Sequence, residues 1–382
     1  MAHDLQLGGL PEKSRHPDPI EAACRLHDRA VACRERSRLA QAEALGRQAL
    51  AILERESGPR HPDVANVLLH LGGVCEDGGD VAGAEARYRR AVAIMEKYAR
   101  PAAHDRDLAR LLVQSLDHLA TLYRVQGRYA EAAPLARRAL KLAERAFPAD
   151  DLEISTALNN LAVLCKYQHR FAQAARLYHR ALAIVEKALG PEHPEAATIQ
   201  HNLGGLEHER GRYAAGEPFA RRSVEIREKA LGPDHPDVAA DLAALAAILD
   251  GQRKDEEAVR LYQRALAIFE RVHGPVHCEL AVNFNNLAAI RHRHGDHAEA
   301  ERLYQRALAI KEKVLGAGHP DVAMTLNNLA VFYAAQGKRG EAGKLYRRAL
   351  RIFKKALGPK HSKVTVCEEN YARLRAKGKE MR

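Results

Sequence analysis

Apolar residues recur along most of this chain at helical spacing, in pairs of blocks separated by short polar breaks. The segment 151–190 shows the pattern most clearly, because Leu158, Leu161 and Cys165 lie on one face of a first predicted helix. A second block, 171–185, has the same periodicity and ends shortly before a Gly-Pro pair, which helices rarely continue through. The pattern predicts a helical hairpin with a short turn.

The hairpin pattern returns every 42 residues, and each return is marked by a glycine followed three positions later by a histidine. The glycines are Gly190, Gly232, Gly274, Gly316 and Gly358, and the histidines are His193, His235, His277, His319 and His361. A fixed period of this length indicates stacked repeats, in which each unit contacts its neighbours. We therefore expect function on a surface, and expect each periodic histidine to form a hydrogen bond across the turn before the next helix.

Small residues in the second helices explain how such hairpins stack, because only small side chains let helices approach closely. One column is Ala42, Ala84, Ala132, Ala174, Gly216, Ala258, Ala300 and Ala342, and the other is Ala49, Ala91, Ala139, Ala181, Ser223, Ala265, Ala307 and Ala349. A third column, Tyr88, Tyr178, Tyr262, Tyr304 and Tyr346, is predicted to fill the core. Because Gly204-Gly205, Gly216 and Ser223 replace residues that pack better in the fifth hairpin, we expect lower local stability there.

The columns divide the chain into three parts. Residues 1–18 are predicted to be a disordered segment, 19–360 the repeat array, and 361–382 a capping helix with a basic tail. The first repeat diverges from the others, and about six inserted residues fall in a loop near 97–107, where extra length costs little.

The residues of the repeat resemble a known family. Leu119-Ala120-Tyr123 and Leu329-Ala330-Tyr333, with the two alanine columns, are similar to the tetratricopeptide repeat. The 42-residue period with "LNNLAVLC" and "GHPDVA" resembles the variant found in kinesin light chains and many bacterial repeat proteins. The resemblance implies an all-α fold, a right-handed α-α superhelix (solenoid) of about eight helical hairpins plus a C-terminal capping helix.

The resemblance also implies a protein-binding scaffold whose first helices line a concave groove for extended peptides. Helical geometry places one variable stripe of these helices beside the buried one. The groove candidates are Asn159, Lys166, Arg124, His201, Asn285, His292 and Asn327. An asparagine amide both donates and accepts hydrogen bonds, as a peptide unit does, and the cationic candidates suit acidic side chains.

Two further polar columns have structural as well as functional interpretations. The column Asn160, Asn202, Asn286, Asn328 and Asn370 is predicted to pack between hairpins rather than to contact a ligand. An arginine column, Arg90, Arg138, Arg180, Arg222, Arg264, Arg306 and Arg348, is predicted to be a solvated outer stripe. Phosphate binding by these arginines and the basic tail is the alternative.

Composition and motifs narrow the function classes. The net charge of +11 and the pI of about 9.4 favour an acidic partner, with nucleic acid or another polyanion as the alternative. The sequence contains no catalytic or metal-binding motif, and its histidine cluster around His294 lacks a recognised ligand spacing, so we expect no enzyme, metal or cofactor. Regulation of an enzyme encoded elsewhere remains open. Six unpaired cysteines and no apolar leader or membrane span predict a cytoplasmic protein.

Overall fold

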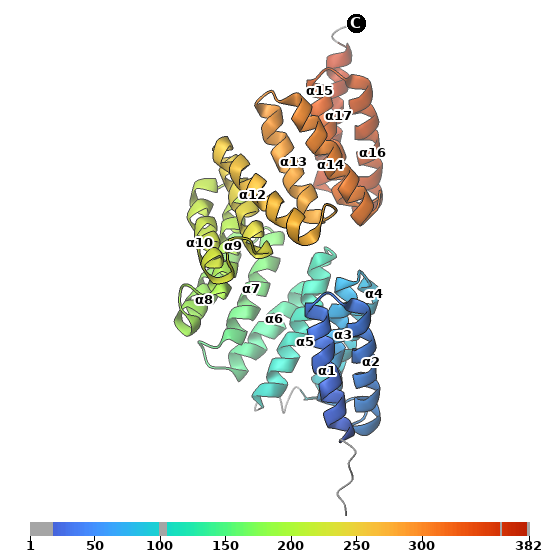
Figure 1. Cartoon of the computed structure of the whole chain (residues 1–382), viewed down its shortest axis with the longest axis vertical. Helices are drawn as coiled ribbons and strands as arrows, with labels where there is room; N and C mark the ends of the chain where they lie inside the picture. Colours follow the sequence, from blue (N-terminus) through green and yellow to red (C-terminus); the bar gives the residue numbers. More distant parts are fainter. Residues whose placement is uncertain (1–17, 99–104, 360, 380–382) are drawn as a thin grey trace, which may run out of the picture. The chain divides into compact units, whose positions relative to one another are not determined.

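The computed structural model describes residues 18–98, 105–359 and 361–379, and within these ranges the chain is helical and has no strand (Figure 1). The helices are α1 (Pro19–Glu35), α2 (Leu39–Glu56), α3 (Pro62–Asp77), α4 (Val81–Met95), the 3-10 helix η1 (Glu96–Tyr98), α5 (Arg106–Val125), α6 (Tyr129–Ala146), α7 (Leu152–Tyr167), α8 (Phe171–Leu189), α9 (Pro194–Glu209), α10 (Tyr213–Leu231), α11 (Pro236–Gly251), α12 (Asp255–His273), α13 (Cys278–Arg293), α14 (His297–Leu315), α15 (Pro320–Ala335), α16 (Arg339–Leu357) and α17 (Ser362–Lys379). The predicted disordered segment, 1–18, lies outside the described residues except for Asp18, as does most of the predicted insertion.

Two compact units make up the chain, one up to Ile184 and one from Val185 onward, with the boundary inside α8. In the first unit, α1–α2, α3–α4 and α5–α6 are hairpins, and α3 and α7 both contact α5. In the second unit, α9–α10, α11–α12, α13–α14 and α15–α16 are hairpins, and α11 contacts both α9 and α13. The predicted all-α stack of helical hairpins is thus confirmed in each unit.

The periodic histidines begin the first helices. In α9, Nδ1 of His193 accepts a hydrogen bond of 3.2 Å from the backbone N–H of Glu195, and Pro194 at the first helical position has no N–H to satisfy. The same cap recurs at His61, His235, His277, His319 and His361. Each histidine therefore closes the first turn of its own helix, which specifies the hydrogen bond expected from the sequence.

The periodic glycines end the second helices. Gly232 has a φ of 85°, in the left-handed region that favours glycine, and its N–H bonds to the carbonyl of Glu228. The repeat at 151–190 is an exception in the short turn between its two helices. There His169, which is not a glycine, adopts a left-handed φ of 57°. These two kinds of residue set the helix ends and hence the register of the stack.

The alanine columns lie in the core. Ala132, Ala139, Ala258 and Ala265 are fully buried, as are most other members of the two columns. The core tyrosines are buried too, and burial raises the pKa of Tyr346 to about 12. In α17, Val364 and Cys367 are buried in a cluster with residues of α15 and α16, so this helix covers the last hairpin.

Candidate protein-interaction surface

Three of the predicted groove residues lie in the first unit, on α5 and α7. The guanidinium carbon of Arg124 lies 5.7 Å from the ring centre of Tyr167, and Nζ of Lys166 lies 5.3 Å from it. Tyr167 is 46% exposed and stacks on Tyr129 at 5.9 Å. The structure thus brings Arg124 and Lys166 together over an exposed aromatic ring, which the sequence analysis missed although it directly follows Lys166. Asn159 is half-buried in the same helix, α7.

A buried carboxylate lies next to this cluster, on α5. Asp117 is 7% exposed, and its carboxylate forms a hydrogen bond with the amide of Asn160 on α7. Burial raises the pKa of Asp117 to about 7, because desolvation outweighs the opposing effect of that hydrogen bond. Asp117 is therefore buried and forms a contact between α5 and α7.

In the second unit, asparagines form a continuous chain of hydrogen bonds across three hairpins and the capping helix. Each carboxamide Nδ2 donates to the next oxygen, in the order Asn370, Asn327, Asn328, Asn285, Asn286 and the hydroxyl of Tyr262, at 3.2–3.4 Å. We call this set the amide chain. Two columns that the sequence analysis treated as separate, one for the groove and one for packing, thus belong to a single network.

Each groove asparagine in the amide chain keeps hydrogen-bond donors and acceptors that the chain does not use. A carboxamide has two N–H donors and two acceptor lone pairs. Asn327 uses one donor toward Asn328 and one lone pair toward Asn370, and Asn285 uses one donor toward Asn286 and one lone pair toward Asn328. Both amides are therefore held in a fixed orientation while retaining donor and acceptor capacity.

A hollow of about 250 Å³ adjoins the amide chain at Asn327, and its other walls include Met324, Lys363 and Val366. Val366 is 52% exposed, and Val331, one turn after Asn327 in α15, is 40% exposed. Exposed apolar side chains next to oriented amides and a lysine provide the three kinds of contact that a peptide segment uses.

His201 is anchored by buried charge. Its Nδ1 lies 2.6 Å from Oδ1 of Asp241, which is fully buried and also accepts a hydrogen bond of 3.0 Å from Arg227. Arg227 in turn donates to the hydroxyl of Thr198. One carboxylate of α11 thereby fixes side chains of α9 and α10, a contact that no local sequence pattern indicated.

His292 packs against aromatic rings. Its ring centre lies 5.1 Å from that of Phe332 and 5.5 Å from that of His297, and burial lowers its pKa, as does the neighbouring His297. The third histidine of this segment, His294, lies 2.8 Å from Asp255. Among the described residues, no three His, Cys, Asp or Glu side chains are grouped so that they could hold a metal ion.

Comparison with known proteins identifies the repeat. The family model described as "Tetratricopeptide repeat" matches residues 21–97, 107–187, 153–229, 195–271, 252–313, 279–355 and 321–380. This chain belongs to the tetratricopeptide repeat family. The resemblance inferred from the sequence is thereby confirmed, and so is the broad expectation of a scaffold for protein–protein interaction, which is the general use of such arrays.

Solved structures of other repeat proteins resemble this tetratricopeptide chain. The apo form of RapI is 15% identical, with a TM-score of 0.59 over 76% of this chain and 98% of its own. A Rap protein in complex with competence and sporulation factor is 13% identical, with a TM-score of 0.56 over 95% of this chain and 100% of its own. A putative kinesin light chain of Podosopora anserina is 26% identical, with a TM-score of 0.45 over 55% of this chain and 98% of its own. Among curated proteins, no sequence matches significantly.

The arginine column of the tetratricopeptide array is bridged to glutamates. The pairs are Arg90–Glu54, Arg138–Glu96, Arg180–Glu144, Arg264–Glu228, Arg306–Glu270 and Arg348–Glu312. In most of them the glutamate lies 36 residues earlier, on the preceding second helix. The arginines are partly exposed, as predicted, but their charge is compensated within the protein. In the part of the chain that the structure describes, no helix is both long and apolar enough to span a bilayer.

Proposed function

We propose that this tetratricopeptide array is a scaffold that binds an extended, acidic segment of a partner protein in a groove along its first helices. The observation that carries the proposal is the amide chain, which orients Asn285 and Asn327 and leaves each with a spare donor and acceptor. An extended peptide presents unpaired N–H and C=O groups, and oriented amides can bind them with little further loss of side-chain entropy.

The positive charge of this chain supports a partner segment that is acidic. Arg124, Lys166 and Lys363 lie on the first helices or the capping helix, and the chain carries a net charge of +11. Complementary charge speeds encounter and discriminates between partners more than it adds affinity. A partner rich in Asp and Glu therefore fits this surface better than a neutral or basic one.

We further propose that the chain has no catalytic activity of its own and works in the cytoplasm. All six cysteines are free, which suits a reducing compartment. The alternative of polyanion binding loses its main support, because the arginines on which it depended are paired with glutamates. Regulation of an enzyme encoded elsewhere is compatible with the scaffold, and would emerge from the identity of the captured partner.

The test compares two double variants in a capture experiment with the full chain. Asn285→Ala/Asn327→Ala removes the groove amides, whereas Asn286→Ala/Asn328→Ala interrupts the same amide chain at the neighbouring positions. We expect the first variant to lose capture of acidic proteins and of an arrayed set of acidic peptides about tenfold more than the second, because only the first removes amides of the proposed groove column. Equal loss in both variants, or equal capture of acidic and neutral peptides, contradicts the groove.

A further inference from the structure

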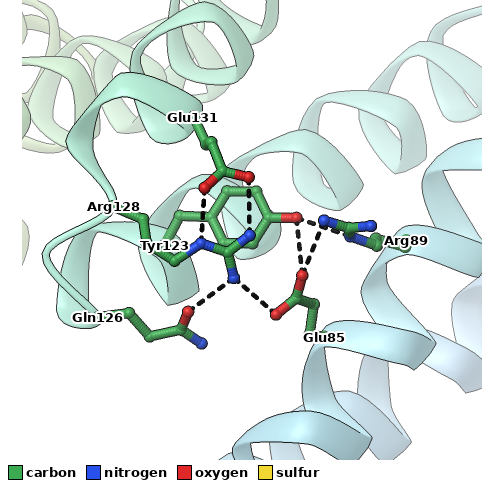
Figure 2. A network of polar contacts seen from close by, with 6 residues as sticks. All are labelled: Glu85, Arg89, Tyr123, Gln126, Arg128 and Glu131. Carbon is green, nitrogen blue, oxygen red and sulfur yellow. Dashed lines mark hydrogen bonds and ion pairs between the residues drawn. The ribbon is translucent and has the colours of Figure 1, made fainter.

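Neighbouring hairpins in the first unit are joined by a polar network (Figure 2). The hydroxyl of Tyr123 donates to Glu85 at 3.1 Å and accepts from Nε of Arg89 at 2.7 Å. Arg128 lies 4.0 Å from the ring centre of Tyr123 and 2.7 Å from Glu85. A glutamate of α4, a tyrosine of α5 and a basic residue before α6 thus tie two hairpins together, and we call this set the junction triad.

The junction triad recurs in the second unit, between α14 and the hairpin α15–α16. Tyr333 donates to Glu301 at 2.7 Å, and Nζ of Lys338 lies 3.2 Å from Glu301 and 5.0 Å from the ring centre of Tyr333. The tyrosine fills the space between helices, and the glutamate and the basic residue satisfy its hydroxyl and its ring face.

One repeat earlier, between α12 and the hairpin α13–α14, all three positions of the triad differ. They are occupied by Val259, Arg291 and Asp296, so this junction has neither the tyrosine nor the glutamate, and its basic position is acidic. The structure has a cavity of about 250 Å³ at this place. Its lining consists of Asp255, Glu256, Val259, Arg260, Ile290, Arg291 and His294. We call it the junction pocket.

The junction pocket has an apolar floor and an excess of cationic groups. Val259 and Ile290 line it, and Nε of Arg291 is buried with no hydrogen-bond partner among the described residues. Arg260 is exposed and has no ion pair within the part of the chain that the structure describes. The charge of Asp255, another lining residue, is neutralised, because Asp255 is held by Arg293 and His294, each at 2.8 Å.

The charge of Arg291 has a weak effect on one other residue, Glu299. It is the smallest of the causes that lower the pKa of Glu299, whose main partner is Arg302 at 2.7 Å. A buried guanidinium nitrogen without a hydrogen bond is costly, and binding an acceptor removes that cost. Glu256 is the remaining acidic residue in the lining, so the two arginines outweigh it.

We infer that the junction pocket binds an aromatic side chain with an adjacent carboxylate, both contributed by a segment of a partner protein. The ring would take the place that Tyr123 and Tyr333 fill at the sister junctions, between apolar side chains and a cation. The carboxylate would take the place of the missing glutamate and bind Arg291 or Arg260. The volume is below the range of about 300–1,000 Å³ typical of pockets for free small molecules, and suits a single side chain.

This inference goes beyond the groove proposed above, because no groove candidate lines the junction pocket. The probe is a fluorescein-labelled peptide of glycine and serine with a central Tyr-Glu pair, compared with matched Ala-Glu and Tyr-Gln peptides by anisotropy with the full chain. We expect each matched peptide to bind about tenfold more weakly than the Tyr-Glu peptide, since each lacks one of the two contacts.

The decisive variant rebuilds the junction triad and fills the pocket, as Val259→Glu/Arg291→Tyr/Asp296→Lys. It should retain the helical content and melting temperature of the natural chain and lose about tenfold or more in affinity for the Tyr-Glu peptide. Arg291→Gln and Arg260→Gln provide the same comparison should the triple variant not fold. Equal affinity for the three peptides, or unchanged binding in the folded variants, overturns the inference, while capture through the groove would be unaffected.

Discussion

Nδ1 of His201 lies 2.6 Å from Oδ1 of the fully buried Asp241. The same oxygen accepts a hydrogen bond from Arg227, so a single carboxylate of α11 joins α9 and α10. Breaking a buried ion pair leaves the remaining charge without compensation, which costs more than the pair itself contributes.

Asp241→Asn should therefore lower the local free energy of opening by about 3 kcal/mol, because Arg227 keeps its charge while its partner becomes neutral. Hydrogen exchange of the α9–α11 amides is the suitable measurement, since repeat arrays do not unfold as one cooperative unit. His201→Gln serves as the control and should cost less than about 1 kcal/mol, because His201 is partly exposed. A control as damaging as Asp241→Asn would contradict this assignment.

Asp117 should make the stability of the α5–α7 region depend on pH. Its pKa is about 7 in the folded protein, against an ordinary value of 3.8, because burial disfavours the carboxylate. A carboxyl group whose pKa is raised by folding contributes stability that is full below about pH 4 and is lost as the pH rises through 7. Exchange rates in α5 and α7, corrected for intrinsic pH dependence, should rise between pH 5 and 8 and then level off.

The matched variant for this prediction is Asp117→Asn, which keeps the shape and a hydrogen-bond acceptor for Asn160 but cannot ionise. Its exchange rates should show no step in this pH range. A step of the same size in the variant would assign the pH dependence to another group.

The periodic part of the fold could be predicted from the sequence, whereas contacts that join different columns could not. Alanines such as Ala132 and capping histidines such as His193 recur at a fixed interval, so their shared environment follows from the repeat alone. The amide chain could not be foreseen, because the pairing of Asn328 with Asn285 depends on how far one hairpin is displaced along the next. Tyr167 and Asp241 were missed for a different reason, since each occurs in a single repeat.

The role of Gly216 in the fifth hairpin could not be predicted from its column either. The sequence suggested that Gly216 weakens packing, but a Cβ at this position would lie 3.0 Å from the backbone oxygen of Gly204. The glycine thus permits a close approach of α10 to α9. The prediction of lower stability in this hairpin can be tested together with this contact.

Gly216→Ala should destabilise the α9–α10 hairpin by about 1 kcal/mol, because the steric cost exceeds the gain in helix propensity. Gly340→Ala in α16 is the contrasting variant, as a Cβ there would meet nothing within 4 Å. It should leave stability unchanged or raise it by up to about 1 kcal/mol. Hydrogen exchange of the α9–α10 and α16 amides distinguishes the two effects, and stabilisation by Gly216→Ala would show that the helices can move apart freely.

The glutamates that pair with the arginine column recur every 42 residues, as at Glu228, Glu270 and Glu312. In the last hairpin, Lys354 occupies the next equivalent position. Lys354 pairs with Glu368 of α17 at 2.6 Å. Lys354→Glu should loosen α17 by about 0.5 kcal/mol, since both side chains are about half exposed and the new charges repel. We expect faster hydrogen exchange in α17 alone, and a return to the original rates in the double variant Lys354→Glu/Glu368→Lys. If the double variant does not recover these rates, the pair is not the cause.

The bridged arginine column also has a consequence for how such a chain can lengthen. A repeat duplicated in the interior would find a glutamate before it and an arginine after it, so both of its charges would be matched at once. A repeat appended after α16 would instead place its arginine against Lys354. A repeat added in the interior would therefore keep every bridge of the column, whereas one added after α16 would place two cationic side chains against each other.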